Sequence, residues 1–183
     1  MEEQLRRKSY ISVGDIFFWT ATINGWKHLI KDDEYKDIII NSFDFLSKKG
    51  LLDIFSFVIM PNHIHFIWRT NSLNGKETVQ GSFLKFTAHE FRKKLQKEDP
   101  DFLDMFAVVK QNKKHEFWQR DSLAVHLTSK IIAYQKLDYI HNNPLAEHWS
   151  LVKDPNDYTY SSCSFYEKGE KRFEFLKDLR NEF

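Results

Sequence analysis

The chain of 183 residues contains few of the residues that crosslink or interrupt a fold: one cysteine, six glycines and four prolines. The single cysteine, Cys163, cannot form an internal disulfide or a cysteine-based zinc cage, and it favours a reducing, cytoplasmic location. No apolar run approaches the roughly 18 residues of a membrane helix, and the charged N-terminus lacks the apolar centre of a signal peptide. We therefore expect a cytoplasmic protein that does not cross a membrane.

A large excess of charge of either sign is also absent, since the formal net charge is +1. This balance argues against a chain that binds nucleic acid through its overall charge, although a local basic patch remains compatible with it. Hydrophobic residues make up 42% and aromatic residues 16% of the chain, which is enough for a well-packed core. With so few glycines and prolines there is little room for a linker. We expect a single domain over residues 1–183, with a core at about 15–166 and a C-terminal tail at 167–183.

Hydrophobic periodicity predicts strands that alternate with helices. The predicted strands are residues 16–23, 52–60, 63–70 and 117–119, and the predicted helices are residues 33–48, 78–97 and a segment from Thr128 or Ser129 to about Asn142. The second and third strands form a hairpin around Pro61 and Asn62. This order predicts an α+β fold, a ferredoxin-like sandwich with a central antiparallel sheet and helices packed on it. No glycine-rich phosphate loop follows the first strand, which disfavours a doubly wound nucleotide-binding fold.

Two histidines, His63 and His65, begin the second strand of the predicted hairpin. Side chains alternate along a strand, so both imidazoles face one side of the sheet, about 7 Å apart. Such a pair can bind one divalent metal ion. The alternative is a pair of hydrogen-bonded core histidines, and the two residues alone leave both explanations open.

On the last predicted helix, Tyr139 lies away from the apolar stripe, and Asn143 follows one turn later. The ordinary explanation is a half-buried tyrosine with a hydrogen-bonded hydroxyl. A chemical explanation connects it to the histidines. A metal ion bound by His63 and His65 would polarise a phosphodiester, and Tyr139 would attack the phosphorus. Asn143 could then be a third, oxygen ligand of the metal ion.

Three segments of the sequence, residues 58–68, 139–144 and 157–162, together resemble motifs of the single-tyrosine HUH transposases, in particular the branch of REP-associated tyrosine transposases. The string Val-Ile-Met-Pro-Asn-His-Ile-His-Phe-Ile-Trp (58–68) resembles the metal-binding signature of the family. Tyr-Ile-His-Asn-Asn-Pro (139–144) resembles its catalytic-helix motif, and Asp-Tyr-Thr-Tyr-Ser-Ser (157–162) resembles its C-terminal motif. The likeness extends over about residues 15 to 166.

The resemblance implies an enzyme that cuts and rejoins single-stranded or hairpin DNA through a 5′-phosphotyrosine and a free 3′-hydroxyl. It implies that Tyr139 is the nucleophile, that His63 and His65 are metal ligands assisted by Asn143, and that the cofactor is Mg²⁺ or Mn²⁺. Both a monomer and a homodimer remain open. Two other functions also remain open: a metal-dependent nuclease that uses activated water, and a non-catalytic module that binds hairpin DNA.

Basic residues gather in residues 76–120, which contain ten Lys or Arg and seven Asp or Glu. Lys85 and Arg92 lie on one face of a predicted helix and could line a groove for phosphates. Unpaired bases stack on aromatic rings, for which Trp26, Trp118 and His115 are candidates. The predicted DNA-binding residues are Lys85, Arg92, Lys93, Lys114, Trp118 and Arg120. For each of them the alternative is a solvated helix face or, for the tryptophan, an ordinary core position.

Overall fold

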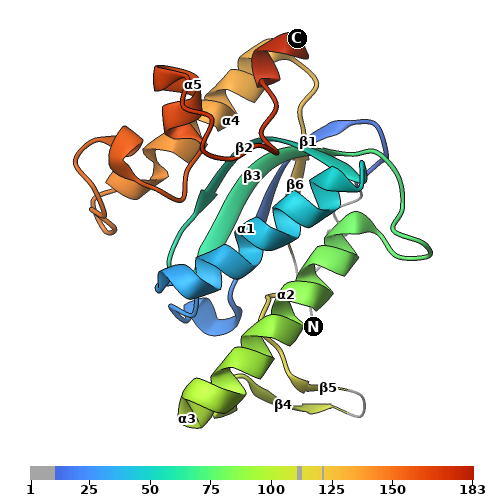
Figure 1. Cartoon of the computed structure of the whole chain (residues 1–183), viewed down its shortest axis with the longest axis vertical. Coiled ribbons are helices and arrows are strands. Elements are labelled where there is room, and N and C mark those ends of the chain that lie inside the picture. Colours follow the sequence, from blue (N-terminus) through green and yellow to red (C-terminus); the bar gives the residue numbers. More distant parts are fainter. Residues whose placement is uncertain (1–10, 111–112, 121) are drawn as a thin grey trace, which may run out of the picture.

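The structure is a computed structural model and describes residues 11–110, 113–120 and 122–183 (Figure 1). Its strands are β1 (Ile16–Thr22), β2 (Leu52–Ile59), β3 (His63–Thr70), β4 (Ala107–Lys110), β5 (Lys113–His115) and β6 (Leu123–His126). Its α-helices are α1 (Asp33–Lys48), α2 (Val79–Glu98), α3 (Pro100–Asp104), α4 (Lys130–Asn142) and α5 (Cys163–Lys168). Short 3-10 helices are η1 (Asn24–Trp26), η2 (Asn143–Leu145), η3 (Pro155–Asp157) and η4 (Leu179–Asn181).

The central sheet contains four antiparallel strands in the order β2-β3-β1-β6, and β4 and β5 pair separately. Along the chain, the sheet and its first two helices follow the order β1-α1-β2-β3-α2-β6. This connectivity and this strand order are those of a ferredoxin-like sandwich, so the predicted fold class is confirmed. In the part of the chain that the structure describes, no helix is long and apolar enough to span a membrane.

Helix α1 ends where the sequence predicts, because Gly50 can adopt a left-handed backbone with a φ of 68°. The Leu51 N–H donates to the Leu46 carbonyl at 3.1 Å, and the Gly50 N–H donates to the Ser47 carbonyl at 2.8 Å. These two bonds form a Schellman motif, which satisfies the last carbonyls of the helix and turns the chain into β2.

The two faces of the sheet carry two separate hydrophobic cores, because side chains alternate along each strand. On one face, Phe66 of β3 packs against Phe43 of α1 and Phe83 of α2, and Trp68 packs against Phe66 in the same core. On the other face, Ile67 belongs to the core that α4 covers. Figure 1 shows α4 and α5 on the side of the sheet opposite to α1. Because His63 and His65 share the register of Ile67, they face α4.

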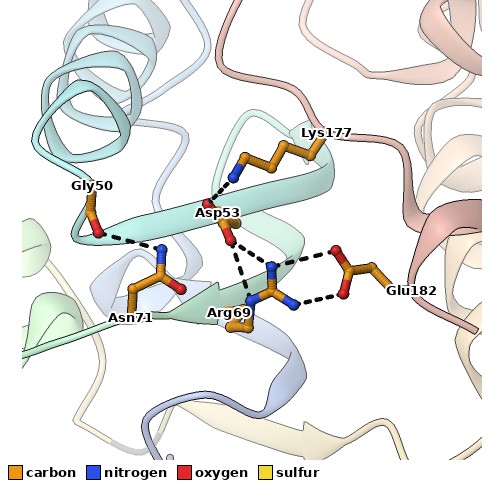
Figure 2. Close-up of polar contacts among 6 residues, drawn as sticks. All are labelled: Gly50, Asp53, Arg69, Asn71, Lys177 and Glu182. Carbon is orange, nitrogen blue, oxygen red and sulfur yellow. Dashed lines mark hydrogen bonds and ion pairs between the residues drawn. The ribbon is translucent and has the colours of Figure 1, made fainter.

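The last residues of the chain pack against the central sheet. Leu179 is fully buried in the core beneath α4. Figure 2 shows the ion pairs that fix this segment: Arg69 bonds both to Asp53, at 2.7 Å, and to Glu182, at 2.6 Å, while Lys177 reaches Asp53 at 2.6 Å. Burial would raise the pKa of Asp53, but the hydrogen bonds from Lys177 and Arg69 outweigh it and hold this pKa below its usual value.

The sequence-based prediction was wrong at the fourth strand of the sheet. Residues 117–119 contribute only an isolated bridge between Trp118 and Ile23, whereas the edge strand is β6, Leu123–His126. The β4–β5 hairpin was not predicted at all. In helix α2 the apolar spacing predicts that Phe86 belongs to the buried stripe, but Phe86 is 47% exposed and the fully buried Thr87 belongs to the stripe instead. Short strands with no clear alternation carry a weak sequence signal.

Candidate active site

The two histidines of β3 form the centre of the candidate site. Their ring centroids lie 4.6 Å apart, and the residues are only 7% (His63) and 6% (His65) exposed. Across the ladder, β1 places Thr22 opposite His63 and Thr20 opposite His65. The pair is therefore held on a rigid, central part of the sheet rather than on a loop.

Asn62 fixes the orientation of His63. The Asn62 Nδ2 donates to the Trp26 carbonyl at 3.0 Å, which leaves its Oδ1 facing His63 Nδ1 at 2.7 Å. An amide oxygen can only accept a hydrogen bond, so His63 Nδ1 carries the proton. Its Nε2 therefore presents a lone pair, which is the form of imidazole that binds a metal ion.

Thr20 plays the corresponding role for His65. Its Oγ1 lies 2.7 Å from His65 Nδ1, and Tyr139 Oη lies 3.4 Å from His65 Nε2. When His65 Nδ1 donates to the threonine, its Nε2 keeps a lone pair, as in His63. Burial lowers the pKa of His65 to about 3, with smaller contributions from His63 and Lys136. Burial likewise lowers the pKa of His63 to about 4. Both imidazoles are therefore neutral at pH 7 and can act as ligands.

Tyr139 approaches the pair from α4. Ser129 caps the start of this helix. Leu137 and Ile140 hold the helix against the sheet, because they are buried in the core on this face. The tyrosine itself is 48% exposed, and its ring centroid lies 5.1 Å from that of His65. The candidate nucleophile Tyr139 and the two candidate metal ligands therefore lie side by side in a single copy of the chain.

Asn143 stands one turn after Tyr139, where Pro144 ends the α-helix. Its Oδ1 is buried and accepts no hydrogen bond from the described residues, while the Asn143 side chain lies beside His63 and favours the protonated form of that imidazole. A buried oxygen without a partner is costly. Two imidazole nitrogens and this amide oxygen fit a small divalent cation. The described residues contain no group of three or more His, Cys, Asp or Glu that could hold a metal ion, so this mixed set is the candidate.

Phe18 forms the floor of the site. Its ring stacks on His65 with a centroid distance of 5.5 Å and meets the edge of Tyr139 at 5.9 Å. Lys136, one turn before Tyr139 on α4, places its Nζ 4.8 Å from the centre of the Phe18 ring and 5.6 Å from that of Tyr139. A half-buried cation therefore lies beside the tyrosine ring.

A buried polar cluster ties α4 to the sheet beneath it. His141 Nε2 lies 3.0 Å from Ser162 Oγ and 3.4 Å from Ser56 Oγ, which belongs to a bulge in β2. Burial lowers the pKa of His141 to about 4. This histidine therefore faces the core, away from the metal candidates, and helps to hold the tyrosine helix in place.

Three of the predicted DNA-binding residues come together on α2 and β5. Lys85, Arg92 and Lys114 line one open cavity of about 440 Å³, together with His115. Lys93, on the same helix, is exposed. Because α2 packs on the other face of the sheet, this basic cavity is separated from the histidine pair by the sheet.

The remaining two residues of this set behave differently. Trp118 is a core residue: it is 6% exposed, packs between Phe83 and Phe91, and donates its Nε1 hydrogen to Thr87 Oγ1 at 2.9 Å. Its ring is not available for stacking on a base, which corrects the prediction. Arg120 is exposed and pairs with Glu116 at 3.0 Å.

The sequence reasoning missed four residues that shape the site. They are Phe18, Thr20, Asn62 and Lys136. Thr20 and Phe18 share one face of the predicted first strand, so alternation could have found them only with knowledge of the strand register. Lys136 lies three residues before Tyr139, which is a helical neighbour position. Asn62 was predicted only as a turn residue.

Comparison with known proteins finds no protein-family model and no curated protein sequence that matches this chain. Among solved structures, a REP-associated tyrosine transposase bound to a REP hairpin is similar over 98% of this chain and 93% of its own, with 18% identity and a TM-score of 0.60. The resemblance predicted from the motifs is thereby confirmed at the level of the fold.

Two further structures are less similar. A protein from Deinococcus radiodurans R1 assigned as a transposase has 15% identity over 74% of this chain and 96% of its own, with a TM-score of 0.38. The tRNA(His) guanylyltransferase of Saccharomyces cerevisiae has 12% identity over 76% of this chain and 62% of its own, with a TM-score of 0.43.

Proposed function

We propose that this protein is a metal-dependent DNA strand transferase of the tyrosine transposase type. It cuts single-stranded or hairpin DNA, stays covalently attached to one end, and rejoins the strand. The observation that carries the proposal is the approach of Tyr139 Oη to within 3.4 Å of His65 Nε2 on the face of a ferredoxin-like sheet. The hairpin bound to the transposase with the similar fold supports hairpin DNA as the substrate class.

His63 Nε2, His65 Nε2 and Asn143 Oδ1 would hold the metal ion, and Mg²⁺ or Mn²⁺ suits a set that includes an amide oxygen. When bound, the ion supplies positive charge that stabilises the extra negative charge on the phosphodiester in the transition state. Asn62 and Thr20 keep both imidazoles in the tautomer that can bind it.

Tyr139 acts as the nucleophile. Its Oη loses its proton to solvent and attacks the phosphorus, so that an ester bond forms between the tyrosine and the 5′ phosphate while the bond from phosphorus to the 3′ oxygen breaks. The 3′ oxygen takes up a proton from solvent and leaves as a free 3′-hydroxyl. Attack by a 3′-hydroxyl on this ester reverses the step and joins the strand, so no nucleoside triphosphate is consumed. Lys136 lies beside the tyrosine ring and would stabilise negative charge on its oxygen as the proton leaves. The packing of α4 on the sheet of the same chain supports a tyrosine that acts in cis.

The test uses hairpin oligonucleotides with single-stranded flanks, labelled at one end, incubated with the protein and Mn²⁺ and run on a denaturing gel. DNA labelled at its 3′ end should move to the mass of the protein, whereas DNA labelled at its 5′ end should appear as a shorter free strand. Substitution Tyr139→Phe should abolish both products. The matched control is Tyr134→Phe on the same helix, which should leave them unchanged.

Each alternative function predicts a different gel. Cleavage that persists in Tyr139→Phe without any covalent species would indicate a nuclease that activates water, and would overturn the proposed mechanism. Bound but uncut DNA in all variants, His63→Ala included, would indicate a binding module without catalysis.

The single cysteine fits a reducing compartment, so we place the activity in the cytoplasm.

A further inference from the structure

Trp26 has a backbone conformation and an exposure that are unusual for tryptophan. Its φ is 56°, in the left-handed region that a bulky side chain rarely adopts, and the residue is 59% exposed, although tryptophan is usually well buried. Hydrogen bonds hold both of its backbone groups: its N–H donates to the Ile23 carbonyl at 2.9 Å, and its carbonyl accepts from Asn62 at 3.0 Å. Backbone strain of this kind is found most often at functional sites.

The exposed indole lies at the edge of the candidate active site. Its centroid is 6.3 Å from that of His63, with an angle of 69° between the rings. The ring of Trp149 lies 5.9 Å from His63 and is only half-buried. The exposed imidazoles of His28 and His148 lie 5.6 Å and 5.4 Å from Trp149. Aromatic rings with polar edges thus surround the outer side of a candidate metal ligand.

We propose that Trp26 and Trp149 form a subsite for one unpaired nucleobase, next to the phosphodiester that Tyr139 attacks. The position of that phosphodiester rests on the proposed function. An exposed indole face accepts any base by stacking, independent of sequence. The ring neighbours of Trp149 are imidazoles, which can donate hydrogen bonds to a base edge or to a phosphate. A stacking surface surrounded by hydrogen-bond donors matches a nucleotide better than an apolar protein partner.

The backbone of Trp26 suggests a variant that removes the ring without disturbing the metal ligands. Glycine adopts a φ of 56° without strain, so Trp26→Gly should keep the carbonyl that orients Asn62 and, through it, His63. Phe86→Ala, which removes an exposed ring on α2, is the matched control.

The experiment measures binding of a fluorescein-labelled single strand, (dT)₁₂, by fluorescence anisotropy in the Tyr139→Phe background with Mn²⁺ present. This background prevents cleavage, so binding is read separately from the chemistry. Trp26→Gly should weaken (dT)₁₂ binding about tenfold, while its Mn²⁺ affinity stays as in the parent protein. Phe86→Ala should bind (dT)₁₂ as the parent does, and Trp26→Phe should recover most of the loss. In addition, one abasic position should weaken binding to the parent but not to Trp26→Gly.

Unchanged (dT)₁₂ binding by Trp26→Gly, or no binding of (dT)₁₂ by the parent protein, would overturn the subsite. A change in sedimentation with protein concentration in Trp26→Gly, without a change in DNA affinity, would instead assign the exposed ring to a contact between two copies. Failure of the proposed function is recognised separately. In that case the wild-type protein forms no covalent DNA adduct, whatever its affinity for (dT)₁₂.

Discussion

Replacing Thr20 by valine tests how the site keeps His65 ready for a metal ion. Valine has nearly the shape of threonine but cannot form the hydrogen bond between Thr20 Oγ1 and His65 Nδ1, which spans 2.7 Å. His65 is only 6% exposed, so water cannot easily replace the lost partner. The imidazole must then either leave a buried N–H unsatisfied, at a cost of about 1–3 kcal/mol, or move its proton to Nε2, where it blocks metal binding.

The unsatisfied N–H would lower the stability of the fold, whereas the shift of the proton to Nε2 must be reversed before a metal ion can bind. We expect the proton shift, and therefore a fall in divalent metal affinity of about 10- to 100-fold. Titration calorimetry with Mn²⁺ measures this directly. Thr22→Val is the matched control, since Thr22 lies on the same strand and face, opposite His63, which uses Asn62 as its partner. Equal Mn²⁺ affinity in Thr20→Val and the wild type would refute the role given to Thr20.

Three further predictions concern α4 and the C-terminal segment. The pKa of His141 is about 4 in the folded protein against about 6.5 in the unfolded chain, so the unfolded state binds the proton first and stability falls as the pH drops below 6.5. Urea unfolding at pH 7.5 and pH 5 should show that the wild type loses about 2 kcal/mol more than His141→Gln. Lys136→Gln should slow DNA cleavage about tenfold in single-turnover assays, with a smaller effect on DNA affinity. Glu182→Gln, which weakens the pair with Arg69, should lower the free energy of unfolding by about 1 kcal/mol in urea titrations, and an unchanged value would show that the pair contributes nothing.

The elements that the sequence predicted well are those with strong local signals. Two apolar runs around Pro61 and Asn62 fix the β2–β3 hairpin, and the left-handed Gly50 fixes the end of α1. The edge strand β6 has no such signal, because only Ala124 and Val125 are half-buried in it and its ends are exposed. It becomes a strand through pairing with β1, a non-local contact that periodicity does not report.

The candidate site divides in the same way. His63 and His65 could be placed on one face from alternation alone, and Tyr139 from the helical wheel. Their approach to each other required knowledge that α4 packs over β3. For Trp118 the local sequence was misleading. Its basic neighbours in the sequence indicated an exposed ring, but the indole packs in the core against α2. The partners Thr20 and Asn62 depend on strand register and turn geometry, which composition does not encode.

The central claim is that Tyr139 forms a covalent bond with DNA, and mass spectrometry of the trapped adduct tests it most directly. After cleavage in the presence of Mn²⁺, the denatured protein is digested with nuclease and trypsin. We predict a nucleotide on the tryptic peptide 137–153, in which Tyr139 is the one tyrosine. A nucleotide on any other peptide, or cleaved DNA without any modified peptide, would contradict the account.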